Sequence, residues 1–134
     1  SKGGNVALHA QGGAENPLAR AAVFNAQGFA RDGISREQRA RMRAGAVNYV
    51  VAGDLIGALL YHPEERFFVR QVPGTNAHSP EAFAFDEAGW PIPAGRTLAS
   101  VGVEILSRAL LALQRLGFAP GVWKLINCPE PNTM

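Results

Sequence analysis

The chain has 134 residues, of which 47% are hydrophobic and 18% are charged, and its formal net charge is +2. These values indicate one soluble globular domain over residues 1–134, with enough apolar material for a core. No apolar stretch is long enough to cross a bilayer, and the single cysteine, Cys128, excludes an internal disulfide framework. No signal peptide is visible, so the compartment stays open between the cytoplasm and secretion.

The first elements alternate between helix and strand. Residues 5–11 predict a short helix that ends at two glycines, and residues 20–25 form the short apolar run that is typical of a buried parallel strand. A second helix is expected over residues 36–44, because Ser35 is a favoured N-cap and Gln38 supplies the other half of a capping box.

The remaining elements continue this alternation. The β-branched residues at 47–51 predict a strand, one or two helical turns are expected over 55–61, and 66–72 predicts a third strand. Apolar residues recur at helical spacing from 98 to 116, which predicts an amphipathic helix. The order predicts an α/β fold with a parallel sheet, in which ligands bind at loops that leave the carboxyl ends of the strands.

Three residues supply the parts of a nucleophilic triad. A serine hydroxyl needs a histidine to take its proton, and the histidine needs a carboxylate to hold its tautomer. Ser1, Asp54 and His78 follow in the order serine, acid, histidine, and Asp54 and His78 lie in loops after predicted strands. We therefore expect Ser1 to be the nucleophile, Asp54 the orienting acid and His78 the base.

The residues after Ser1 meet the steric needs of a nucleophile elbow. Gly3 and Gly4 allow a helix to pack closely against its sheet, and the backbone N–H of Lys2 is placed to form half of an oxyanion hole. The residues that precede the serine in such an elbow are missing from this chain.

Four segments resemble a known family. They are Ser1-Lys2-Gly3-Gly4-Asn5-Val6-Ala7-Leu8, Val23-Phe24-Asn25-Ala26-Gln27-Gly28-Phe29, Val50-Val51-Ala52-Gly53-Asp54-Leu55-Ile56-Gly57 and Asn76-Ala77-His78-Ser79-Pro80-Glu81-Ala82-Phe83. The first is similar to the Gly-His-Ser-Lys-Gly-Gly-Asn elbow of a bacterial group related to class 3 lipases. The others resemble, in order, the strand after the elbow, the acid loop and the histidine segment.

The resemblance implies the C-terminal part of an α/β-hydrolase, with its N-terminal strands absent from this chain. It implies a bacterial serine hydrolase that cleaves acyl esters, lipid-like ones above all, without a cofactor or a metal. Phe83 and Phe85 are expected to bind the substrate, because they supply apolar surface near the histidine loop. Expected partners are the acyl ester or lipid, a membrane surface, and an N-terminal chain of the same protein.

Other interpretations remain open at each position. Ser1 is also explained as an ordinary terminal residue, or as a nucleophile activated by its own α-amine. Asp54 is a favoured N-cap for the segment that follows it. Further acids and histidines compete for the same roles: Asp32 and Asp86 as the acid, His9 within the first helix, and His62, which we expect to cap a turn.

Other functions receive less support. Arg36, Arg39 and Arg43 share one helix face, which is either solvated or able to meet anionic lipid headgroups. A zinc site is disfavoured because the histidines lack the short spacings of zinc ligands. Nucleic acid binding is disfavoured because few aromatic residues lie near the basic cluster. Cys128 is disfavoured as a nucleophile because no motif places a histidine beside it. The alternatives to an enzyme are a non-catalytic module that keeps the hydrolase scaffold for binding, or a fragment that completes its fold with a partner chain.

Overall fold

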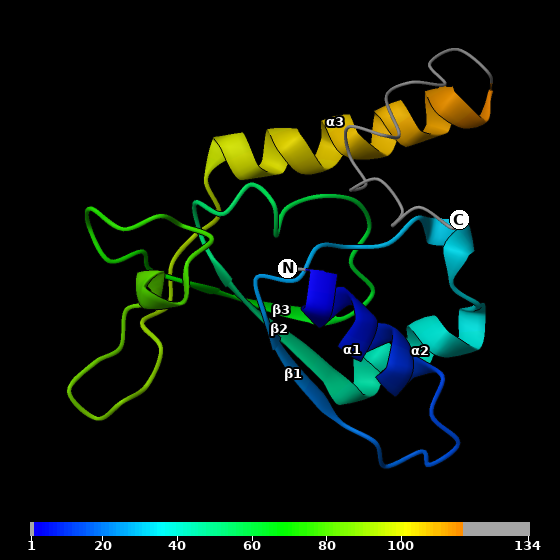
Figure 1. Cartoon of the computed structure of the whole chain (residues 1–134), viewed down its shortest axis with the longest axis horizontal. Coiled ribbons are helices and arrows are strands. Elements are labelled where there is room, and N and C mark those ends of the chain that lie inside the picture. Colours follow the sequence, from blue (N-terminus) through cyan, green and yellow to red (C-terminus); the bar gives the residue numbers. More distant parts are fainter. Residues whose placement is uncertain (1, 117–134) are drawn as a thin grey trace, which may run out of the picture.

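A three-stranded parallel sheet organises the protein. The computed structural model describes residues 2–116, and its strands are β1 (Ala21–Phe24), β2 (Ala46–Val51) and β3 (Glu65–Val69), in the order β1-β2-β3 (Figure 1). In the register, Phe24 lies beside Tyr49 and Tyr49 beside Phe67. The predicted α/β class with a parallel sheet is confirmed.

Two helices cover one face of the sheet. Helix α1 (Lys2–Gly12) contacts both β1 and helix α2 (Arg36–Gly45), as Figure 1 shows. The predicted capping box of α2 is present, since Ser35 Oγ accepts from the Gln38 backbone and the Gln38 side chain accepts from the Ser35 backbone. The core beneath these helices consists of Leu8, Val23, Ala26, Phe29, Ile34, Met42 and Ala46.

The opposite face of the sheet carries a row of aromatic rings. Side chains alternate between the two faces along a strand, so Phe24, Tyr49 and Phe67 share one face. The ring centroids of Phe24 and Tyr49 are 5.5 Å apart, and those of Tyr49 and Phe67 are 5.9 Å apart. A second core closes the carboxyl end of this face, around the short 3₁₀ helix Pro80–Ala82, and consists of Val51, Val69, Ala82 and Phe83.

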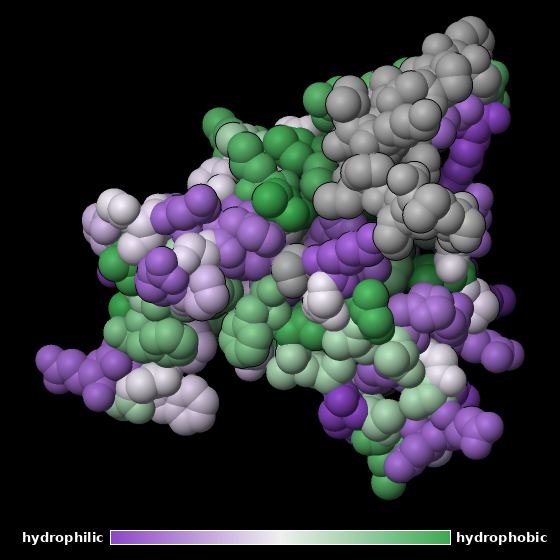
Figure 2. All heavy atoms as spheres, in the orientation of Figure 1, coloured by the Kyte–Doolittle hydropathy of each residue, from purple (hydrophilic) through white to green (hydrophobic). Residues whose placement is uncertain are grey.

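Helix α3 (Leu98–Arg115) turns its polar side toward the protein. The predicted helix is present, but its buried residues are Ser100, Glu104 and Ser107, whereas Leu98 and Ile105 are exposed. An amphipathic helix usually buries its apolar stripe. Figure 2 accordingly shows hydrophobic atoms gathered on the surface over the start of α3.

Ion pairs explain this orientation of α3. The Glu104 carboxylate accepts from Arg66 at 3.3 Å and also pairs with Arg96. Burial lowers the pKa of the Arg66 guanidinium. Burial opposes ionisation of Glu104 as well, but the charges of Arg66 and Arg96 outweigh it and hold the Glu104 pKa below its usual value.

Two local predictions were wrong. Residues 55–61 form turns rather than helix, because the Asp54 carboxylate accepts from the backbone N–H groups of Ile56 and Gly57 and so diverts the chain. The third strand ends at Val69 instead of residue 72, because Arg70 exchanges backbone hydrogen bonds with the later segment, donating to Ile92 O.

Within residues 2–116, no helix combines the length and apolar character needed to cross a membrane. Cys128 lies outside the described residues.

Candidate functional site

The structure brings Asp54 and His78 into direct contact. His78 Nδ1 lies 3.0 Å from Asp54 Oδ2 and 3.1 Å from Oδ1. The Asp54 side chain is only 2% exposed, whereas that of His78 is 29% exposed. A buried carboxylate therefore supports a histidine ring that a ligand can reach.

Backbone hydrogen bonds fix the Asp54 carboxylate. Its Oδ1 accepts from Ile56 N and its Oδ2 from Gly57 N, both at 3.1 Å. A Cβ on Gly57 would lie 2.7 Å from Asp54 Oδ2, so only glycine allows this close approach. The turn-capping role and the role of histidine partner, which the sequence left as alternatives, are combined in this one side chain.

Local hydrogen bonds also hold His78. Its backbone N–H donates to Asn76 Oδ1 at 3.0 Å, and the preceding residue, Ala77, accepts from Asn25 Nδ2 at 3.2 Å. When Nδ1–H donates to a carboxylate, the ring is held in the tautomer whose Nε2 carries the lone pair. In that tautomer, Nε2 of His78 is the ring nitrogen that does not face Asp54.

An apolar cavity of about 550 Å³ adjoins the His78 ring. Its volume lies within the range of small-molecule pockets, roughly 300–1,000 Å³. Phe83 and Phe85, the two residues predicted to bind substrate, both line it, together with Phe24, Asn25, His78 and Pro80. Sequence reasoning missed Phe24, although its position at the end of a strand that leads to the site was a usable signal.

Helix α1 begins beside the segment that follows β1. A Cβ on Gly4 would lie 2.7 Å from the Cβ of Ala26, and Asn5 Nδ2 donates to Gly28 O at 2.9 Å. The predicted close packing of the helix is therefore found at Gly4, whereas Gly3, predicted for the same role, is exposed. Ser1 lies outside the described residues, and Lys2, the expected oxyanion donor, is the first residue of α1.

The competing acids lie in other environments. Asp32 is exposed and pairs with Arg115. Asp86 accepts from the backbone of Ala88 and Trp90 in an exposed turn. Neither carboxylate contacts a histidine in these interactions.

The competing histidines differ from His78 as well. His62 was expected to cap a turn, but its side chain is fully buried, and its Nδ1 lies 2.8 Å from Glu64 Oε1. Asn48 Nδ2 donates to the same oxygen at 3.1 Å, so His62 belongs to a buried polar cluster. His9 is exposed on α1, with its ring centroid 6.5 Å from that of Phe29.

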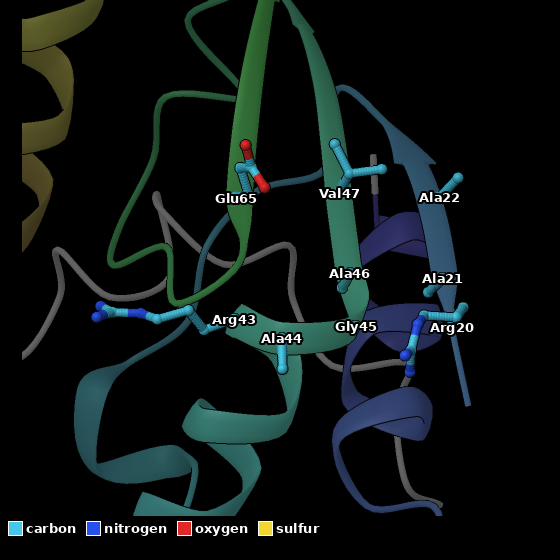
Figure 3. Close-up of a pocket in the computed structure, with 9 residues that line it drawn as sticks. All are labelled: Arg20, Ala21, Ala22, Arg43, Ala44, Gly45, Ala46, Val47 and Glu65. Atoms are coloured by element: carbon cyan, nitrogen blue, oxygen red, sulfur yellow. The ribbon is translucent and has the colours of Figure 1, made fainter. Parts of the chain in front are cut away.

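The arginines of and near α2 lie in different surroundings. Arg39 Nη1 donates to the backbone oxygens of Arg31 and Ile34, so one of the three predicted arginines supports the fold. A shallow hollow of about 410 Å³ lies at the amino ends of the strands, between Arg20 and Arg43. Figure 3 shows the Arg43 side chain extending away from Arg20, so the two guanidinium groups do not face each other. Among the described residues, no three potential metal ligands lie together.

Comparison of the chain with protein-family models, with curated proteins and with solved structures finds no match.

Proposed function

We propose that this chain is a serine hydrolase that cleaves acyl esters with an apolar acyl group. The observation that carries the proposal is the buried Asp54 carboxylate in contact with His78 Nδ1, beside an apolar cavity. An acid and a histidine in this relation activate a hydroxyl nucleophile. The sequence supplies Ser1 as that nucleophile.

In the proposed reaction, Ser1 Oγ attacks the ester carbonyl carbon while His78 Nε2 takes the hydroxyl proton. The resulting oxyanion accepts a hydrogen bond from the Lys2 backbone N–H, at the positive end of α1. Collapse of the tetrahedral intermediate breaks the bond to the alcohol, which leaves with the proton from His78. Water, activated by the same histidine, then releases the acid and restores the serine. Asp54 holds the ring and balances its charge throughout.

The cavity favours an apolar acyl group. Three of its six lining residues are phenylalanines, Phe24, Phe83 and Phe85, and the rings of Phe24 and Phe83 lie edge to face with their centroids 5.6 Å apart. Each buried CH₂ of a substrate contributes about 0.8 kcal/mol to binding. Esters of medium-chain acids should therefore be cleaved in preference to acetate esters.

The test is active-site labelling of the full chain with a fluorophosphonate probe. Cleavage after arginine yields the peptide of residues 1–20, in which Ser1 is the only residue with a hydroxyl or thiol side chain. We expect this peptide to carry the label in the wild type, to lose it in Ser1→Ala and to be labelled far more slowly in His78→Gln.

The exposed His9 provides the matched control, because His9→Gln removes a histidine that does not contact Asp54 and should leave labelling unchanged. A folded wild type that leaves Ser1 unlabelled, or labelling that ignores His78→Gln, contradicts the proposal.

A second function is favoured by the exposed apolar side chains of α3. Leu98 is 91% exposed and Leu116, just beyond the helix, is 72% exposed. Ile105, Leu106 and Leu113 of the same helix are exposed as well. Exposed apolar side chains that gather on one element are typical of interaction sites. A non-catalytic module that binds another polypeptide would show concentration-dependent association that requires Leu98 and Ile105, without labelling of Ser1.

A further inference from the structure

Asn25 occupies a special place at the carboxyl end of β1. It directly follows the last strand residue, is only 3% exposed and has a positive φ of 49°. Asparagine adopts this left-handed conformation more readily than most residues. Its backbone N–H donates to Tyr49 O at 2.8 Å, which continues the pairing with β2 beyond the strand.

The side-chain amide of Asn25 connects two segments that are far apart in sequence. Its Oδ1 accepts from Val51 N at 2.9 Å, and its Nδ2 donates to Ala77 O at 3.2 Å. Only this orientation of the amide places a donor against the carbonyl and an acceptor against the N–H. Each end of the side chain therefore has a distinct partner.

Both partners lead directly to the candidate site. Val51 ends β2, and its carbonyl accepts from Asp54 N at 2.9 Å. Ala77 is the residue before His78. The amide of Asn25 thus joins the segment that presents the acid to the loop that presents the base.

We propose that Asn25 is a positioning residue that holds His78 against Asp54, and this inference rests on the proposed function for the reaction that the pair serves. A misplacement of about 1 Å at a reacting group lowers a rate roughly 100-fold. Loss of the bond to Ala77 should therefore reduce turnover more than it reduces substrate binding.

Two variants separate the contributions of Asn25. Asn25→Gly removes the amide and tolerates the positive φ, so backbone strain is not introduced. Asn25→Asp keeps an acceptor for Val51 N but has no donor for Ala77 O. For hydrolysis of a chromogenic medium-chain ester, we expect kcat to fall about 10- to 100-fold in both variants, by a larger factor than KM rises.

Asn48→Ala is the matched control. Asn48 is also a buried asparagine next to the end of β1, and it exchanges hydrogen bonds with the backbone of Ala26 at 2.9 and 3.2 Å. It projects from the face opposite Tyr49 and bonds to Glu64 rather than to the histidine loop. Its replacement should lower stability and leave kcat of the folded fraction unchanged.

A second readout does not depend on catalysis. In the NMR spectrum of protein with ¹⁵N-labelled histidine, the hydrogen bond to Asp54 should protect the Nδ1 proton of His78 from exchange with solvent. Its signal is assigned by its loss in His78→Gln. We expect this signal in the wild type and in Asn48→Ala, and its loss in both Asn25 variants.

These readouts distinguish the two proposals. Loss of the signal in the Asn25 variants, with a wild type that cleaves no ester, would retain the positioning role and remove the proposed function. Retention of the signal, or an unchanged kcat in an active enzyme, overturns the positioning role. Failure of both Asn25 variants to fold would overturn it too, because Asn25 would then be purely structural.

Discussion

Replacement of Gly4 by alanine should force α1 away from the strand that it covers. The new Cβ would lie 2.7 Å from the Cβ and 3.4 Å from the Cα of Ala26, whereas carbon atoms in contact prefer about 3.5–4.0 Å. The neighbour is a short side chain on a buried segment, so it cannot rotate away. Relief requires a shift of the helix by about 1 Å, and such overpacking typically costs about 1–3 kcal/mol.

Gly3→Ala is the matched change in the same turn of α1, at an exposed position. Both substitutions gain up to about 1 kcal/mol of helix propensity, so this gain cancels when the two variants are compared. Urea denaturation should therefore place the free energy of unfolding of Gly4→Ala about 1–3 kcal/mol below that of Gly3→Ala. The same shift of α1 should slow fluorophosphonate labelling of Ser1 about 100-fold in Gly4→Ala. Equal stabilities for the two variants would refute the close packing of α1 on Ala26.

Three further predictions concern charge and aromatic packing. Because Arg66 and Arg96 hold the pKa of Glu104 below its usual value, its stabilising contribution is present at neutral pH and is lost as the pH falls through the folded-state pKa. In urea denaturation at pH 7, Glu104→Gln should therefore lower the free energy of unfolding by about 1–3 kcal/mol. The free energy of unfolding should also fall less steeply between pH 7 and pH 3 in the variant than in the wild type. The same pH profile in both proteins would count against this ion pair. Phe83→Ala removes a buried ring and should cost about 3 kcal/mol, measured by thermal unfolding, and a cost below about 1 kcal/mol would show that the ring is not part of the core. Phe85→Ala removes a ring that is 55% exposed, so it should cost less than about 1 kcal/mol and instead reduce the preference for octanoate over acetate esters; an unaltered preference would place the acyl group elsewhere.

Local patterns sufficed for much of the candidate site. A β-branched run followed by Asp54, and a third strand followed by His78, predicted two loops at one edge of a parallel sheet, where the structure brings the two side chains together. The capping box at Ser35 and Gln38 was equally readable, because both partners lie within one helical turn. Ser1 as the nucleophile stays a prediction.

Other features depend on partners that are distant in sequence. The His62 side chain is buried against Glu64, whose carboxylate also accepts a hydrogen bond from Asn48. Asn48 lies in β2, far from His62 in the sequence. The turns at 55–61 have a local cause instead, because the Asp54 carboxylate accepts from the backbone N–H groups of Ile56 and Gly57, two and three positions further on. Only the burial of His62 depends on a distant segment.

The sequence alone determined the three strands, the long helices and the capping box at Ser35, since each depends on neighbours within a few positions, and it shows directly that the acid precedes the histidine. Only the tertiary structure decided which face of α3 is buried. The amphipathic pattern distinguishes an apolar from a polar face, but it does not show that Arg66 and Arg96 pair with Glu104 on the polar one. The tertiary structure also decided that Asn25 reaches both Val51 and Ala77. Contacts between segments that lie many residues apart depend on the register of the sheet and on the path of its loops. Neither of these can be predicted from the spacing of residues along the chain.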